Sequence, residues 1–166
     1  MGASVARVGA VLAFVLAGSA TLHALEVTSS QGQAELRAGD TPWRRAVIGR
    51  PIGAGTTLST WRDSAIIAER DGIRLDIAPF TQIEVTSVLP GTAILLHAGR
   101  IDVQVVEASD VSVEVGGFTV RATDASFTVN RRGATVREGT ITVTGPSGTA
   151  SVISAPGSVS FVLHSP

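Results

Sequence analysis

The sequence predicts an all-β protein: a stack of short strands, solenoid-like or folded as a twisted β-sandwich, after an N-terminal signal helix. Apolar and polar residues alternate in many short runs, which is the pattern of strands with one buried face. Turn residues such as Asp-Gly, Gly-Gly and Pro-Gly recur about every eight to twelve residues, a spacing typical of sandwiches, barrels and solenoids. Val, Ile and Thr favour strands and are abundant, and no convincing helical segment follows residue 25.

Residues 1–24 have the three parts of a secretory signal peptide. Arg7 supplies a positive charge, residues 8–17 form an apolar run, and the small residues that follow form a cleavage site. We therefore expect this segment to be removed on export, leaving a single β domain over residues 25–166 in the periplasm or outside the cell. The alternative is an uncleaved anchor, because residues 8–25 carry no charge and approach the length of a membrane span. In that case the protein would contact the membrane through this segment only.

The remaining chain is predicted to form a series of strands joined by tight turns. The alternating runs are residues 73–77, 83–86, 101–105, 111–115, 118–122, 127–130 and 141–144. Asp71-Gly72 and Gly116-Gly117 each separate two apolar runs, so we expect two-residue hairpins there. Residues 147–166 are rich in Ser and Gly with scattered Val, and they predict one or two weaker strands that close an edge of the sheet.

The composition excludes several kinds of chemistry. The chain has no Cys, so disulfides, thiolate nucleophiles and cysteine-based zinc sites are impossible. It also has no Lys and no Tyr, and its 13 basic residues are all Arg. A net charge of -1 offers no electrostatic footprint for nucleic acid. Three His and few other acid–base groups leave little for catalysis, so we expect a non-enzymatic protein without a cofactor or a metal.

The densest basic cluster directly follows Trp43. Arg side chains can clamp carboxylates bidentately, so Arg44 and Arg45 are candidates for contact with an anionic partner. We expect Trp43 itself to be a core residue in a strand, with the arginines on the solvent side.

Three further residues are candidates for partner contact. Trp61 precedes a predicted strand, where it is either a surface anchor or a packed cap, and Trp is enriched in binding hot spots. Arg131 and Arg132 lie between Asn130 and Gly133, two residues that tolerate the backbone conformations of a hairpin tip. Arginines at such a tip are usually just solvated, so contact with a partner is the second interpretation for them.

The carboxylates are expected to lie on solvent faces. Asp76 and Asp102, for example, alternate with apolar residues in predicted strands. A lone His97 at the end of an apolar run is expected to be exposed or hydrogen-bonded rather than a ligand. A carboxylate pair for glycoside hydrolysis stays open as a remote alternative, because strand register can bring distant residues together.

Between residues 30 and 144, turn-plus-strand elements follow one another in a distinctive order. The elements are residues 32–35 with Trp43, 53–60, 63–67, 71–75, 77–85, 94–103, 118–129 and 135–143. Among them are Asp-Gly before a strand at 71–72, a Pro-x-Thr element at 79–81 and Glu-Gly before a strand at 138–139. This order resembles the FecR-type periplasmic domain. The chain departs from the family pattern at some turns, where Ile73 replaces the usual Ser and Ala125 the usual Gly.

The resemblance implies an all-β, solenoid-like stack and a non-enzymatic role. Such a protein would be an exported binding or sensor module in bacterial envelope signalling or protein–protein interaction, with another envelope protein as its partner. A structural protein of the cell envelope or surface, with the same fold and no sensing role, is the alternative. A carbohydrate-acting enzyme is the remote alternative. The likeness covers the sensor module alone, so it implies no sigma-factor output.

Overall fold

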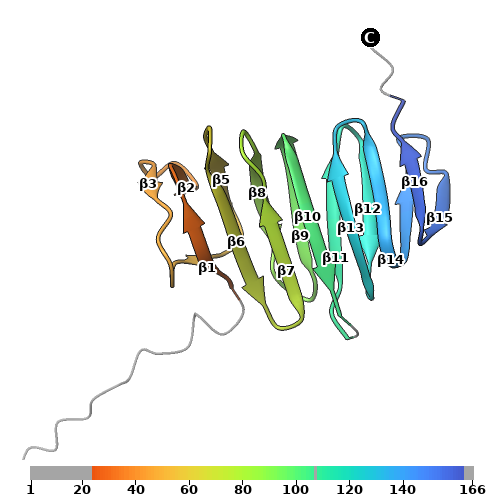
Figure 1. The fold of residues 1–166 in the computed structure, drawn as a ribbon, viewed down its shortest axis with the longest axis horizontal. Helices are drawn as coiled ribbons and strands as arrows, with labels where there is room; N and C mark the ends of the chain where they lie inside the picture. Colours follow the sequence, from red (N-terminus) through yellow and green to blue (C-terminus); the bar gives the residue numbers. More distant parts are fainter. Residues whose placement is uncertain (1–23, 107, 163–166) are drawn as a thin grey trace, which may run out of the picture.

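The alternating residues form strands throughout the part of the chain that the structure describes. This part comprises residues 24–106 and 108–162 of a computed structural model (Figure 1). It contains no helix, and therefore none that could cross a membrane. The all-β class is confirmed for this part. The signal helix predicted within residues 1–24 lies outside the described residues, apart from Ala24.

Sixteen strands follow one another along the described chain. They are β1 (Leu25–Gln31), β2 (Ala34–Ala38), β3 (Arg44–Arg45), β4 (Pro51–Ile52), β5 (Thr56–Thr60), β6 (Ala65–Arg70), β7 (Ile73–Ile77), β8 (Gln82–Ser87), β9 (Thr92–Ala98), β10 (Arg100–Val105), β11 (Val111–Val115), β12 (Phe118–Ala122), β13 (Ala125–Asn130), β14 (Gly133–Thr144), β15 (Ala150–Ser154) and β16 (Gly157–Ser160). Most of them are short, and β14 is the longest with 12 residues. The predicted stack of short strands is therefore present.

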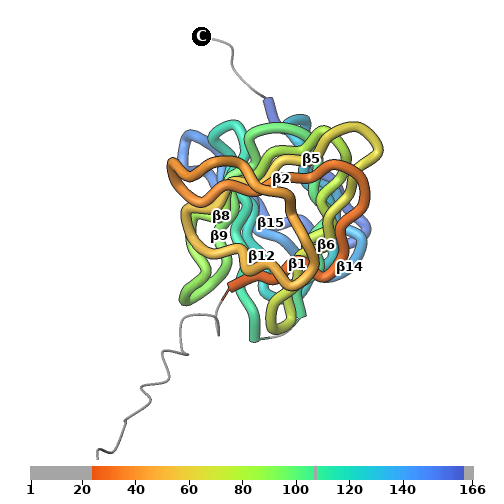
Figure 2. Tube along the Cα trace, turned by 90° about the vertical axis from the view of Figure 1, so that its left-hand side faces the viewer, coloured from red at the N-terminus to blue at the C-terminus, as the bar shows by residue number. Residues whose placement is uncertain are grey.

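Hydrogen bonds join the strands into one mixed sheet that is folded into two facing layers (Figure 1). Layer A contains β4, β1, β6, β7, β10, β13, the first part of β14 and β16. Layer B contains β3, β2, β5, β8, β9, β11, β12, the second part of β14 and β15. Neighbouring strands are antiparallel except β9 and β11, which are parallel. Viewed along the stack, the chain winds around a shared interior, as in a solenoid (Figure 2).

The long strand β14 connects the two layers. Its first residues pair with β13 and β16 in layer A, and its last residues pair with β12 and β15 in layer B. The change of layer occurs near Gly139, which has a φ of 73°. A Cβ at this position would lie 2.1 Å from the carbonyl oxygen of Asp124, so only glycine fits here.

The interior is filled by aliphatic side chains from both layers. The period-two pattern turns them inward, and one continuous cluster of buried apolar residues results. Leu75, Val103 and Phe127 lie side by side on β7, β10 and β13, and each is at most 1% exposed. Phe127 is the largest of the fully buried side chains among the described residues. The predicted alternation of buried and solvent-facing positions is therefore confirmed for these strands.

The predicted turns are found where expected. Asp71-Gly72 connects β6 to β7, and Gly116-Gly117 connects β11 to β12. Residues 131–132 form the tip of the β13–β14 hairpin. The two weaker C-terminal strands are β15 and β16, and each lies at an outer edge of its layer.

Several passages of the chain from one layer to the other collect at one rim of the stack. The register brings the ends of β1, β7 and β13 to the same edge as the starts of β6 and β10. The end of β1 pairs with the start of β6. The end of β7 pairs with the starts of β6 and β10, and the end of β13 also pairs with the start of β10. We call this edge the crossing rim, and it consists of residues 32–33, 61–64, 78–81, 99 and 131–132. It forms the upper edge of the molecule in Figure 1.

Replacing Phe127 with Ala is expected to lower the free energy of unfolding by about 3–5 kcal/mol, because it leaves a cavity in the centre of the core. The matched control is Phe80→Ala, which removes the same atoms from a side chain that is 62% exposed and should change stability by less than about 0.5 kcal/mol. Urea unfolding followed by circular dichroism measures both. Equal losses in the two variants would contradict the placement of the core.

Candidate functional site

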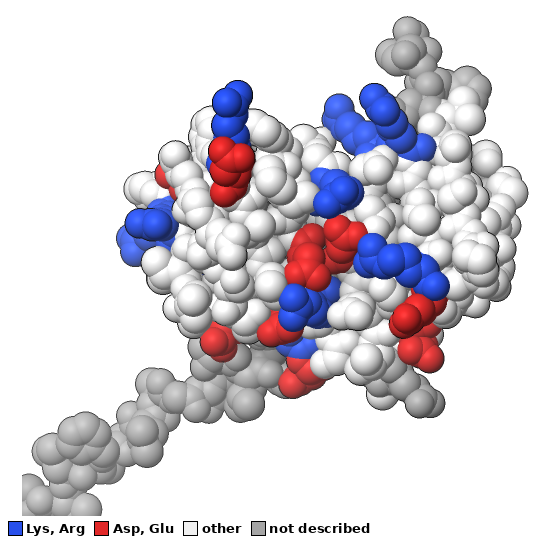
Figure 3. Space-filling view, viewed as in Figure 1, with Lys and Arg blue, Asp and Glu red and all other residues white. Residues whose placement is uncertain are grey.

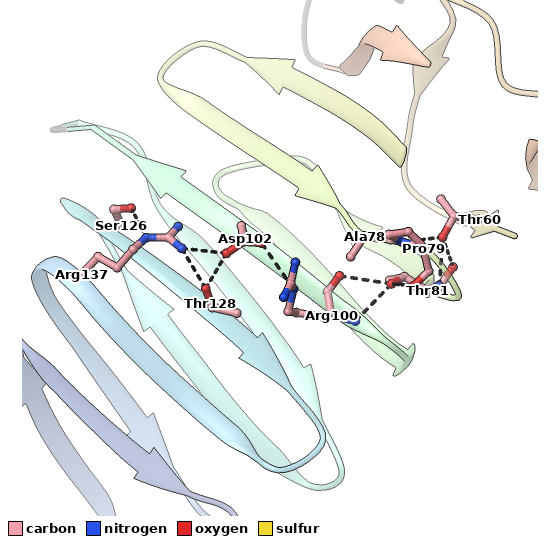
Figure 4. Close-up of polar contacts among 9 residues, drawn as sticks. All are labelled: Thr60, Ala78, Pro79, Thr81, Arg100, Asp102, Ser126, Thr128 and Arg137. Carbon is pink, nitrogen blue, oxygen red and sulfur yellow. Dashed lines mark hydrogen bonds and ion pairs between the residues drawn. The ribbon is translucent and has the colours of Figure 1, made fainter. Parts of the chain in front are cut away.

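Two buried threonines hold the crossing rim together (Figure 4). The hydroxyl of Thr60 donates to the carbonyl oxygen of Ala78 at 2.6 Å and accepts from the backbone N–H of Thr81 at 2.9 Å. The hydroxyl of Thr81 donates to the carbonyl oxygen of Arg100 and accepts from its N–H, both at 3.1 Å. We call Thr60 and Thr81 the threonine clasp. Through these bonds the clasp ties the loop after β5, the loop after β7 and the start of β10 to one another.

Gly99 allows the loops to approach this closely. A Cβ at Gly99 would lie 2.2 Å from the hydroxyl oxygen of Thr81 and 2.5 Å from its Cα. The φ of Gly99 is 86°, in the region that favours glycine. The turn between β9 and β10 therefore depends on glycine for both its conformation and its packing.

The threonine clasp positions two exposed aromatic side chains. Trp61 directly follows Thr60 and is 51% exposed, and Phe80 directly precedes Thr81 and is 62% exposed. The backbone N–H of Phe80 donates to the carbonyl oxygen of Trp61 at 3.4 Å, and the hydroxyl of Ser64 donates to the same oxygen at 2.6 Å. We call Trp61 and Phe80 the aromatic pair. Of the two interpretations of Trp61, the surface position is the one observed.

Phe80 has a strained backbone. Its φ is 54°, in the left-handed region that bulky residues rarely occupy. Such strain persists only where the surrounding structure holds the residue in place, and it is concentrated at functional sites. Here the holding groups are the hydroxyls of the threonine clasp on either side of the loop. Sequence reasoning did not identify Phe80, and its position between Pro79 and Thr81 was the signal available.

The predicted arginines of the hairpin tip lie on the same rim. Arg131 and Arg132 are both exposed, and the side chain of Asn130 accepts a hydrogen bond from the N–H of Arg132 at 2.7 Å. Asn130 stands opposite Arg100 in the register of β13 and β10. Figure 3 shows Arg side chains projecting along this upper edge of the molecule. The crossing rim therefore presents exposed aromatic groups and positive charge together.

Arg44 and Arg45 lie apart from these loops, on the edge strand β3, and both are exposed. The register places Arg45 beside Glu35, and Glu35 beside Ser59, two residues before Trp61. Arg45 is thus two strands, about 10 Å, from the strand that leads to the aromatic pair. The structure brings Trp61, Arg131 and Arg132 to one rim, and it leaves Arg44 and Arg45 at the adjacent end.

The expectation that Trp43 is a core residue is wrong. Trp43 precedes β3 outside any strand and is 38% exposed. The guanidinium group of Arg37 covers its ring, with 4.8 Å between the guanidinium carbon and the ring centroid, which is a favourable cation–π distance. The physical reason is that β3 is an edge strand of two residues, and the buried position of this segment is occupied by the small side chain of Ala46.

A network centred on Asp102 lies on the outer face of layer A (Figure 4). Its carboxylate accepts a hydrogen bond from the hydroxyl of Thr128 and one of 2.8 Å from the guanidinium of Arg137, and the guanidinium of Arg100 lies at 3.6 Å. Burial acts to raise the pKa of Asp102, but the bonds from Thr128 and Arg137 and the charges of both arginines outweigh it and lower the pKa. Sequence alternation placed Asp102 on a solvent face and missed this network.

The same face carries an open depression with a volume of about 780 Å³. The carboxylate residues Glu69, Asp71, Asp124 and Glu138 are among those that line it, together with Arg74. The guanidinium of Arg74 pairs with the carboxylate of Glu69 at 2.9 Å.

Within residues 24–106 and 108–162 there is no group of three His, Asp or Glu side chains that could hold a metal ion. His97 is half-buried and lies 3.4 Å from the carboxylate of Glu84, in agreement with the expected hydrogen-bonded role.

Comparisons of this chain with family models, with curated proteins and with solved structures found no match. The crossing rim and the outer face of layer A are therefore the two features from which a function can be inferred. The rim carries exposed aromatic and arginine side chains, which are types that bind proteins, on loops held by the threonine clasp. The depression is a concave surface lined by carboxylates.

Replacing Thr60 with Val is expected to lower the free energy of unfolding by about 1–3 kcal/mol, because it leaves buried backbone groups of the rim without a partner. The matched control is Thr92→Val. The hydroxyl of Thr92 is buried without a hydrogen-bond partner in the described part of the chain, so its loss should leave stability unchanged or raise it by up to about 1 kcal/mol. Thermal and urea unfolding measure both variants. A loss in Thr92→Val as large as in Thr60→Val would contradict the role of the clasp.

The lowered pKa of Asp102 predicts a dependence of stability on pH. Because the pKa is lower in the folded than in the unfolded protein, the ionised carboxylate stabilises the fold above its ordinary pKa of 3.8, and this contribution is lost as the pH falls through the folded value. The difference in stability between the wild type and Asp102→Asn should therefore be full near neutral pH and shrink below about pH 4. Urea unfolding over a pH series measures it, with Asp40→Asn, on an exposed turn, as the control for the loss of one charge. A difference that is constant over the series would contradict the network.

Proposed function

We propose that this chain is an exported, non-catalytic binding module of the FecR type, which acts in bacterial envelope signalling or protein–protein interaction. The observation that carries the proposal is the aromatic pair, two exposed aromatic side chains whose backbones are held by the buried threonine clasp. Large aromatic residues and Arg are the types that dominate the energy of protein interfaces. A partner would be another envelope protein with an apolar recess for Trp61 and Phe80.

The rigidity of the rim supports this use. Binding through flexible loops costs conformational entropy, whereas a loop that is already held in its bound conformation loses little. Three hydrogen-bonded loops meet at the clasp, and its hydrogen bonds hold the left-handed backbone of Phe80. The arginines at 131–132 on the same rim would favour carboxylates around the recess of the partner.

The resemblance to the FecR-type domain is consistent with this proposal. Its Pro-x-Thr element corresponds here to Pro79-Phe80-Thr81, which supplies one half of the clasp and one member of the aromatic pair. The signal pattern of residues 1–24 supports export, and an exported module would act in the periplasm or outside the cell. The same fold in a structural envelope protein would not need strained, exposed aromatic groups on a rim, which favours the binding module over that alternative.

A carbohydrate-acting enzyme is the second candidate, and the depression on layer A is the observation that favours it. Asp124, in the turn before β13, and Glu138, on β14, both line it, and pairs of carboxylates perform glycoside hydrolysis. Its lining contains no aromatic residue among those described, so it offers no ring on which a sugar could stack.

The binding module predicts that a Trp61→Ala/Phe80→Ala variant loses its partner. The wild-type protein, immobilised and exposed to solubilised envelope extract, should retain one specific protein. Truncating two hot-spot aromatic residues costs about 2 kcal/mol or more each, so the variant should retain at least tenfold less of that protein. Quantitative mass spectrometry of the bound fraction measures this ratio.

The matched control is Trp43→Ala, which removes an exposed Trp outside the crossing rim and should retain the partner as the wild type does. Equal retention by the rim variant and the wild type would refute the rim as the binding site. Hydrolysis of a glycan by the purified protein, lost in Glu138→Gln, would establish the enzymatic candidate instead.

A further inference from the structure

The two ends of the stack differ in how their strand edges are protected. At the N-terminal end the segment from β3 to β4 pairs with β2 in layer B and with β1 in layer A, so one piece of chain bridges both layers. The backbone N–H of Ala46 donates to the carbonyl oxygen of Ala34 at 2.8 Å. The backbone N–H of Val27 donates to the carbonyl oxygen of Arg50 at 3.0 Å. Figure 2 shows this segment crossing the end of the stack that faces the viewer.

The same end carries the residue types that protect sheet edges from pairing. Strands β3 and β4 have two residues each; β3 consists of Arg44 and Arg45, and β4 begins with Pro51. Very short strands, charged side chains and proline all prevent an edge from adding another strand. The N-terminal end is therefore closed to further strand pairing.

The edge strands at the C-terminal end are longer, and they lack the charged residues and the proline of the other end. Strand β15 ends layer B and β16 ends layer A, and each has β14 as its only strand partner in the described part of the chain. Their sequences, ASVIS and GSVS, contain no charge and no proline. The chain has no Asp, Glu, Lys or Arg after Glu138. Figure 3 shows the right-hand end of this face of the molecule as an uncharged surface.

This end also leaves part of the core open. A pocket of about 430 Å³ lies between the last strands and is lined in part by Phe118, Val143, Val159 and Val162. The rings of Phe118 and Phe161 stack beside it, with 4.6 Å between their centroids. Val162 is 68% exposed at its border. Repeat stacks normally cover such an end with a polar cap, because an open core face is insoluble on its own.

We propose that this end is the interface for a second copy of the chain, with β15 pairing to β15 and β16 to β16 around a two-fold axis. A two-fold axis perpendicular to the layers brings the two copies of each edge strand together antiparallel. Both layers then continue from one copy into the other, and the two open pockets face each other and close.

The occupant is a second copy because this surface is complementary to itself. Two uncharged edges can meet without repulsion, and both layers end at the same place, so one copy satisfies both edges at once. A single strand of another protein would satisfy one edge and leave the other unpaired. Because the N-terminal end is closed, the assembly stops at two copies and does not grow into a filament.

The test is the mass of the purified protein in solution, measured by light scattering after gel filtration over a wide range of concentration. We expect the mass of two chains at high concentration. Val152, at the middle of β15, is 69% exposed, and Val152→Lys places two positive charges near the two-fold axis. This variant should give the mass of one chain at every concentration, with unchanged circular dichroism.

The matched control is Ile48→Lys, which adds the same charge to a side chain that is 67% exposed at the closed end, and it should still give two chains. Hydrogen exchange supplies an independent readout, since the amides of β15 and β16 should gain protection as the concentration rises while those of β3 do not. A wild-type protein that stays monomeric would overturn the proposal. So would a Val152→Lys variant that still dimerises, or an Ile48→Lys variant that does not.

Discussion

The fold depends on one constraint: the central strands have a buried face, and each passage of the chain must present that face to the other layer. The side chains that meet in the middle are mainly Val, Ile and Leu, and the charged groups stay outside. Since no disulfide is possible, stability comes from this apolar layer and from the hydrogen bonds between strands. The long strand β14 changes layer near Gly139, so its two halves contribute buried side chains to both layers.

The crossing rim is a consequence of that constraint. Tight passages between facing layers bring loops close together, and their buried backbone groups need hydrogen-bond partners. The hydroxyls of Thr60 and Thr81 supply these partners, and Gly99 supplies the space. The same arrangement projects Trp61 and Phe80 into solvent from a backbone that these hydrogen bonds hold in place. The proposed binding surface and the packing of the rim thus have one physical origin.

The two proposed surfaces differ in kind. The rim offers protruding groups to a recess on a partner, whereas the C-terminal end offers unpaired backbone and an open core to an identical surface. They lie at different places on the stack, because the rim runs along its length and β15 and β16 form its end (Figure 1). Because antiparallel pairing of the end strands reverses the strand direction, a dimer formed through the ends would present its two rims on opposite edges, and each rim would bind its own partner.

Alternation and turn residues were enough to predict strands, the hairpins at 71–72 and 116–117, and the weak C-terminal strands. They were enough because these features depend on neighbours along the chain. Trp43 was misplaced because its exposure depends on the edge position of β3, which is a long-range property. The Asp102 network was missed because its partners, Thr128 and Arg137, come from other strands, and only the register brings them together.

The sequence alone thus determined the all-β class, the positions of most turns and the types of residue exposed to solvent. Only the tertiary structure decided which strands are neighbours, which loops share a rim and which edges stay open, because those depend on pairing between residues far apart in the chain.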